Sequence, residues 1–159
     1  MSYEAFAYYY DSLMDQDFYN DYIQFINEHV KDYQTVLELG CGTGKLMSLL
    51  GNAGFDMIGV DNSVDMLQIA REKTSPEFLY LLQDMREFEL YGTVKAVVSV
   101  CDSVNYITEK EDLTEVFRLV NNYLDPKGLF IFDFNTDYKY RDMTSSMSFF
   151  LIVRSDSVS

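Results

Sequence analysis

Apolar and polar positions follow two different periods along the chain. Apolar residues that recur every three or four positions predict helices, whereas short unbroken apolar runs predict buried strands. The helical period covers residues 4–14, 18–30, 45–50, 64–73 and 113–124. Short strand-like runs, most of whose residues are apolar, cover residues 35–39, 57–60, 78–82, 96–100 and 129–134. Strands therefore alternate with helices after two initial helices, and the residues at 125–128 are expected to form the turn before the fifth strand.

This alternation predicts an α/β domain with a doubly wound, mostly parallel sheet and helices on both faces. The 159 residues fit one domain, which we place at residues 1–142. Residues 143–159 do not continue the alternation and form an atypical tail with one apolar run, Phe149–Val153. Because an apolar fifth strand needs cover at its edge, we expect either that this run adds as a strand or that the chain forms a homodimer through this side.

Three alternate glycines, Gly40, Gly42 and Gly44, stand in the turn between the first strand and the next helix. Ligands of doubly wound sheets bind outside the carboxyl ends of the strands, and glycines there let the backbone approach a ligand. A dinucleotide fingerprint would need its third glycine at position 45, and a phosphate loop would need Ser or Thr at position 46. Lys45 and Leu46 stand there instead, so both kinds of phosphate site fail on spacing.

The segment Val36–Leu46 resembles the first motif of class I S-adenosylmethionine-dependent methyltransferases. Further family features follow in order: Asp61 ends the second strand, Asp84-Met85 follows the third, and Val100-Cys101-Asp102 ends the fourth. The resemblance covers roughly residues 1–142. It implies the Rossmann-like methyltransferase fold, S-adenosyl-L-methionine as cofactor, and transfer of a methyl group to a small-molecule acceptor.

The same resemblance implies which residues bind the cofactor. Asp61 would hold the two ribose hydroxyls, Asp84 and Met85 the adenine, and Val100 and Cys101 the methionine part. The full set at the strand ends is Glu38, Gly40, Cys41, Gly42, Asp61, Asn62, Met66, Asp84, Met85, Val100 and Cys101. An acidic pocket suits a sulfonium cation that carries no phosphate.

A second resemblance concerns the start of the chain. Tyr10–Met14 is similar to a segment of glycine-methyltransferase-like small-molecule enzymes, in which N-terminal helices, here residues 1–31, fold over the cofactor as a lid. Tyr10 is then implied as a lid contact, with a packing tyrosine as the alternative.

Composition narrows the remaining classes of function. The formal net charge of −14 repels a phosphate backbone, so we expect no nucleic-acid partner. No apolar run approaches the roughly 20 residues that span a bilayer, so we expect no membrane association. Only two cysteines occur, which suits a reducing compartment and a cytoplasmic location. His29 is the only histidine and no ligand cluster surrounds it, so no metal site is expected.

Methyl transfer from a sulfonium is an in-line displacement that mainly requires positioning and desolvation, so no catalytic residue is assigned. Relatives usually carry about two more strands and a helix after the fifth strand, and this chain stops resembling them near Thr144. Two other interpretations therefore stay open. One is a shortened, catalytically impaired cofactor-binding or interaction module, and the other is a different ligand on the same fold.

Overall fold

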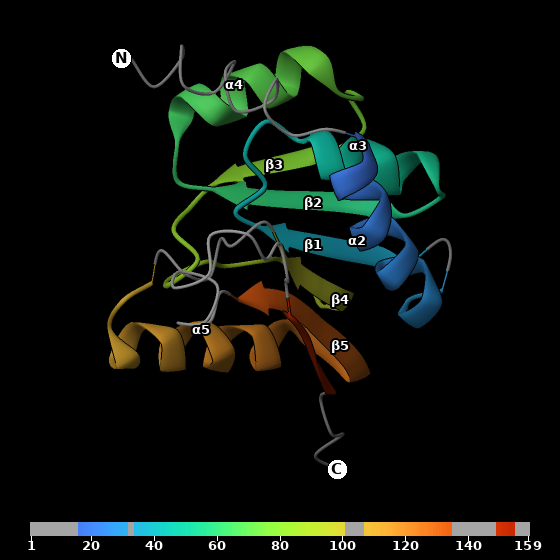
Figure 1. Cartoon of the computed structure of the whole chain (residues 1–159). Coiled ribbons are helices and arrows are strands. Elements are labelled where there is room, and N and C mark those ends of the chain that lie inside the picture. The colour runs from blue at the N-terminus through green and yellow to red at the C-terminus, as the bar shows by residue number, and fades with distance from the viewer. Residues whose placement is uncertain (1–15, 32–33, 101–106, 135–148, 155–159) are drawn as a thin grey trace, which may run out of the picture.

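The core of the structure is a twisted sheet whose strands run mostly in one direction (Figure 1). The computed structural model describes residues 16–31, 34–100, 107–134 and 149–154. Within these residues the sheet has the order β3-β2-β1-β4-β5-β6. The strands are β1 Thr35–Leu39, β2 Asp56–Asp61, β3 Leu79–Leu82, β4 Val94–Ser99, β5 Leu124–Phe134 and β6 Phe149–Arg154.

Strands β1 to β5 are mutually parallel, and β6 is antiparallel to β5. The winding direction reverses between β1 and β4, which are neighbours in the sheet but distant in sequence. This is the switch point at which open α/β sheets bind ligands beyond the carboxyl ends of their strands. The predicted doubly wound architecture is confirmed.

Four helices among the described residues cover the two faces of the sheet (Figure 1). They are α2 Gln16–His29, α3 Lys45–Asn52, α4 Val64–Lys73 and α5 Lys110–Tyr123. Apolar side chains of α2, α3 and α4 pack in one core cluster, whereas those of α5 pack in the other. Side chains of successive strand residues point to opposite faces of the sheet. Val36 therefore packs in the first cluster and Leu37 in the second.

Most predicted elements are found with shifted ends. Helix α2 covers 16–29 instead of 18–30, and α5 covers 110–123 instead of 113–124. Helix α4 has the predicted bounds because Ser63 caps it, with its Oγ accepting a hydrogen bond from the backbone N–H of Met66 at 3.2 Å. The predicted helix at residues 4–14 lies outside the described residues.

The turn predicted at residues 125–128 is wrong as a boundary between α5 and a strand. Leu124 is buried and already pairs with Val94, and the register resumes where Ala96 pairs with Leu129. The intervening residues form a bulge within β5, in which Lys127 has a φ of 63°. The residue types at 125–128 are typical of a turn. Leu124 is nevertheless buried and paired with Val94, so β5 begins before these residues.

The apolar run of the tail forms β6 and pairs with β5 from Leu129↔Arg154 to Phe134↔Phe149. The first alternative expected for this run is therefore the one that the structure shows, and the edge of β5 is covered within one chain. Dimerisation stays a prediction. No helix in the described part of the chain is long and apolar enough to cross a membrane.

Candidate functional site

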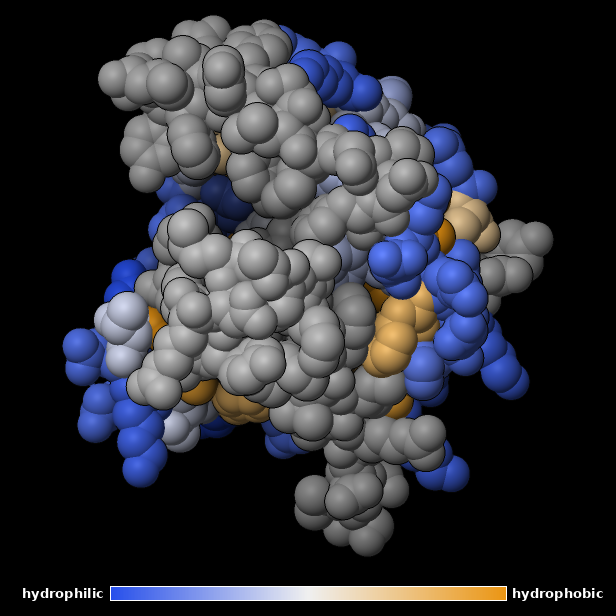
Figure 2. All heavy atoms as spheres, in the orientation of Figure 1, coloured by the Kyte–Doolittle hydropathy of each residue, from blue (hydrophilic) through white to orange (hydrophobic). Residues whose placement is uncertain are grey.

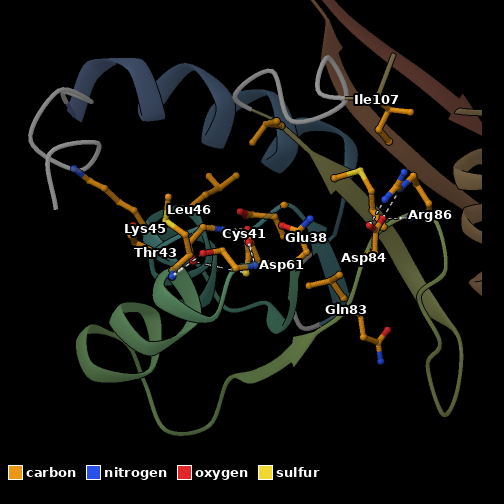
Figure 3. Close-up of a pocket in the computed structure, with 18 of the residues that line it drawn as sticks. Glu38, Cys41, Thr43, Lys45, Leu46, Asp61, Gln83, Asp84, Arg86 and Ile107 are labelled. Atoms are coloured by element: carbon orange, nitrogen blue, oxygen red, sulfur yellow. Dashed lines mark hydrogen bonds and ion pairs between the residues drawn. The ribbon is translucent and has the colours of Figure 1, made fainter. Parts of the chain in front are cut away.

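A cavity of about 810 Å³ opens beyond the carboxyl ends of the central strands (Figure 3). Ten of the predicted cofactor residues line it: Glu38, Gly40, Cys41, Gly42, Asp61, Asn62, Met66, Asp84, Met85 and Val100. The other two, Tyr10 and Cys101, lie outside the described residues. Residues at or after the ends of four different strands thus meet in one place, as expected for parallel strands that end at one edge.

The glycine turn is held against β2 by its own backbone. The N–H groups of Gly40 and Cys41 both donate to the carbonyl oxygen of Val60, at 2.8 and 3.1 Å. Gly42 has a φ of 56°, and a Cβ at this position would meet no atom within 4 Å. Gly44 has a φ of 79°, and a Cβ there would collide with the Tyr80 hydroxyl. The left-handed backbone explains why glycine stands at both positions. Because no atom lies close to Gly42 where a Cβ would be, a ligand in the cavity can approach the backbone there.

Asp61 connects the glycine turn to the start of α4. Its Oδ2 accepts a hydrogen bond from the Gly42 N–H, and its Oδ1 accepts one from the Ser63 N–H, each at 2.9 Å. Burial raises the pKa of the Asp61 carboxyl, and these backbone donors oppose that rise. Each carboxylate oxygen has two lone pairs, so Asp61 can accept further hydrogen bonds from hydroxyl groups in the cavity.

Glu38, the last polar residue of β1, is only 4% exposed. Its Oε2 has no hydrogen-bond partner among the described residues. Burial, and secondly the charge of Asp61, raise the pKa of the Glu38 carboxyl well above its usual value. An unpaired buried acceptor on a cavity wall requires an explanation, and a cationic donor in the cavity would supply one.

Asp84 sits on a separate part of the wall and is paired with Arg86 (Figure 3). Two guanidinium nitrogens of Arg86 donate to the Asp84 carboxylate, Nε to Oδ1 at 2.9 Å and an Nη to Oδ2 at 2.6 Å. These hydrogen bonds lower the pKa of the Asp84 carboxyl. The pair forms at the point where the chain leaves β3.

Sequence reasoning missed several residues that line the cavity. They are Tyr19, Thr43, Lys45, Leu46, Val60, Ser63, Gln83, Arg86, Ile107, Thr108, Glu109 and Asp112. Some stand beside motif residues, and their position next to Gly42, Asp61 or Asp84 could have indicated them. Tyr19 and the residues at the start of α5 carry no such signal, because only the folded sheet brings them to this edge.

The chemical character of the cavity is mixed. Among the described residues that line it, carboxylates come from four segments and two side chains are cationic, Lys45 and Arg86. The Nζ of Lys45 lies 5.2 Å from the centroid of the Tyr19 ring. No group of three or more His, Cys, Asp or Glu side chains in the described part of the chain could hold a metal ion. Hydrophilic residues predominate around the described surface drawn in Figure 2.

The comparisons with known proteins all lead to methyltransferases. A family model described as a methyltransferase domain matches residues 36–128. The chain is 36% identical over 152 residues to YqeM of Bacillus subtilis (strain 168), whose name gives it as a candidate methyltransferase. That match covers 94% of this chain and 62% of YqeM, so the chain spans less than two thirds of this relative.

Two further relatives agree. The crystal structure of an S-adenosylmethionine-dependent methyltransferase from Clostridium acetobutylicum ATCC 824 superposes with a TM-score of 0.73 at 31% identity, covering 89% of this chain and 61% of that one. A Streptomyces venezuelae dTDP-3-amino-3,4,6-trideoxy-alpha-D-glucopyranose N,N-dimethyltransferase is 29% identical over 112 residues, 70% of this chain and 47% of its own length. With its doubly wound sheet and its glycine turn at the switch point, the chain belongs to the class I S-adenosylmethionine-dependent methyltransferase family.

Proposed function

We propose that the chain binds S-adenosyl-L-methionine in the cavity described above and transfers its methyl group to a small-molecule acceptor. The observation that carries this proposal is the buried Glu38 carboxyl beside Asp61 and the glycine turn, whose Oε2 has no hydrogen-bond partner among the described residues. A zwitterionic ligand with an ammonium group and ribose hydroxyls offers donors for both acids. Membership of the methyltransferase family supports S-adenosylmethionine as this ligand.

The residues present fit this cofactor. Glu38 would accept from its ammonium group, and Asp61 from its ribose hydroxyls through the lone pairs that Gly42 and Ser63 leave open. The open space above Gly42 would let the ligand approach the backbone. Asp84 and Met85 would face the adenine, and Val100 the methionine part. Asn62, Met66 and the loop residue Cys41 complete this wall, and we extend the proposal to Tyr10 and Cys101.

When bound, the cofactor would supply a methyl group on a sulfonium, whose departure leaves a neutral thioether. The chain itself then has three tasks: to orient the cofactor through Glu38 and Asp61, to hold the acceptor in line with the methyl group, and to keep water away. No dedicated base is required unless the acceptor arrives protonated. A small-molecule acceptor is supported by the Streptomyces venezuelae relative, whose name specifies a nucleotide-linked amino sugar.

A second candidate function is a cofactor-binding module without turnover. It rests on the same cavity lining, to which no catalytic residue is assigned. Both candidate functions require the same cofactor site. They differ in whether a methyl acceptor also binds beside the cofactor and reacts with it.

Titration calorimetry with S-adenosylmethionine and S-adenosylhomocysteine tests the shared part. We expect saturable binding of both ligands with one site per chain. No heat and no thermal shift at millimolar ligand would contradict the proposal. Incubation with methyl-labelled cofactor and a panel of amine, acid and hydroxyl acceptors then separates the candidates, because only the enzyme forms a labelled product.

A further inference from the structure

Arg86 makes several polar contacts at the wall of the cavity. Its side chain donates to both oxygens of Asp84, and its backbone N–H also donates to Asp84 Oδ1 at 2.9 Å. A further guanidinium nitrogen reaches Asp112 Oδ2 at 3.3 Å, on the first turn of α5. Asp84, Arg86 and Asp112 all line the cavity.

The arrangement leaves the two Asp84 oxygens in different states. Oδ1 accepts two hydrogen bonds from Arg86, whereas Oδ2 accepts one. With two lone pairs on each oxygen, Oδ2 keeps an acceptor site. A planar guanidinium that donates to both oxygens also fixes the plane of the carboxylate, which a single ammonium could not do.

Exposed ion pairs contribute little to stability, and the Arg86 and Asp84 side chains are 49% and 20% exposed. Stability therefore does not account for this network. Orientation does, because the guanidinium is held from two sides, by Asp84 after β3 and by Asp112 at the start of α5. The hydrogen bonds from Arg86 also keep the Asp84 pKa low, so the carboxyl stays an acceptor at neutral pH.

We propose that Arg86 is a positioning residue that orients the Asp84 carboxylate as a fixed acceptor and thereby makes the site selective for a 6-amino purine over a 6-oxo purine. The proposal rests on the proposed cofactor site. An oriented carboxylate accepts a hydrogen bond from an amino group, whereas it repels a carbonyl oxygen at the same position. Without Arg86 the carboxylate can rotate away or accept water, and the preference falls.

The test compares two ligands that differ at this atom, S-adenosylhomocysteine and S-inosylhomocysteine, by calorimetry at pH 7. We expect the wild-type chain to prefer the amino ligand by at least about tenfold, the size of one charge-assisted hydrogen bond. Arg86→Ala and Arg86→Gln should both reduce that preference about fivefold or more, and Asp84→Asn should reduce it similarly. The readout is the ratio of the affinities for the two ligands, because a general loss of structure would weaken the binding of both ligands equally.

Arg118→Ala is the matched control. Arg118 is also exposed and donates to both oxygens of one carboxylate, that of Glu115 within α5, but it does not line the cavity. This variant should keep the wild-type preference. Retention of the preference in folded Arg86 variants, or equal binding of the two ligands by the wild type, would overturn the inference. If the wild type binds neither ligand, the proposed function itself fails.

Discussion

The backbone N–H of Gly42 donates to Oδ2 of Asp61 at 2.9 Å, although 18 residues separate the two in the chain. The other oxygen of the same carboxylate accepts from the Ser63 N–H. One side chain at the end of β2 thus fixes both the glycine turn and the entry to α4. Because the hydrogen bonds cross between β1 and β2, the parallel register of these strands determines the shape of the cavity floor.

Replacement of Asp61 should therefore affect both folding and binding. Asp61→Ala leaves two backbone N–H groups without their acceptor and should lower the free energy of unfolding by about 1–3 kcal/mol. It should weaken S-adenosylmethionine binding by about 2–4 kcal/mol, because two ribose hydroxyls also lose a charged acceptor. Denaturant unfolding and calorimetry measure the two effects.

Asp61→Asn serves as the control, because it keeps a neutral carbonyl acceptor and should fall between wild type and Asp61→Ala in both measurements. Unchanged cofactor affinity in folded Asp61→Ala would mean that the acid only ties the two loops together.

The buried Glu38 carboxyl predicts a pH dependence of stability. Its pKa in the folded chain is raised well above 4.5 by burial and by Asp61. A raised folded-state pKa means that the stabilising contribution is complete below the unfolded pKa and is lost as the pH rises through the folded pKa. Relative to Glu38→Gln, the wild type should thus lose unfolding free energy as the pH rises above about 4.5. Denaturation of both proteins across this range measures the difference, and parallel curves would contradict it.

Glu38 should also couple binding to protons. An ammonium group beside this carboxyl favours its ionised form, so cofactor binding should release a proton and strengthen as the pH rises toward the folded pKa. Calorimetry in two buffers of different ionisation enthalpy detects that release. Glu38→Gln should bind without it. If the wild type releases no proton in the range where Glu38 is protonated, the ammonium does not lie against this side chain.

The glycine turn offers a matched pair of substitutions. Gly44→Ala places a Cβ against the Tyr80 hydroxyl in a left-handed backbone, and should cost about 2–3 kcal/mol of unfolding free energy. Gly42→Ala has a similar φ but meets no atom, so it should cost only about 1–2 kcal/mol.

The two substitutions should rank in the opposite order for binding, since the Cβ at Gly42 enters open space beside the proposed ligand. Denaturation and cofactor titration of both variants measure this reversal. Equal losses of stability would show that the backbone conformation alone matters and that the contact with Tyr80 does not.

Strand β6 covers the edge of β5 and should limit self-association of the chain through that edge. A chain that ends at Arg141 would expose the N–H and C=O groups of β5 that face β6 between Leu129 and Phe134. Open apolar edges recruit other strands, so light scattering should show more self-association of the shortened chain than of the full chain. Equal solubility and a monomeric state in both forms would assign no covering role to β6.

Sequence alone determined most of the described helices and strands and the fold class that they form. The apolar runs identified the five parallel strands, and Ser63 marked the start of α4, because these signals act within a few residues. The spacing of Gly40, Gly42 and Gly44 excluded both phosphate-binding loops and indicated the family that the comparisons confirm.

Only the tertiary structure decided the contacts between distant segments. The burial of Glu38, the contact of Arg86 with Asp112 and the pairing of β6 depend on residues far apart in the chain, and periodicity carries no information about them. The bulge at residues 125–128 has the same cause, since Leu124 joins β5 only because Val94 lies opposite it. Local sequence encodes turns and periods, whereas side-chain charge states and strand partners follow from which surfaces the folded sheet brings together.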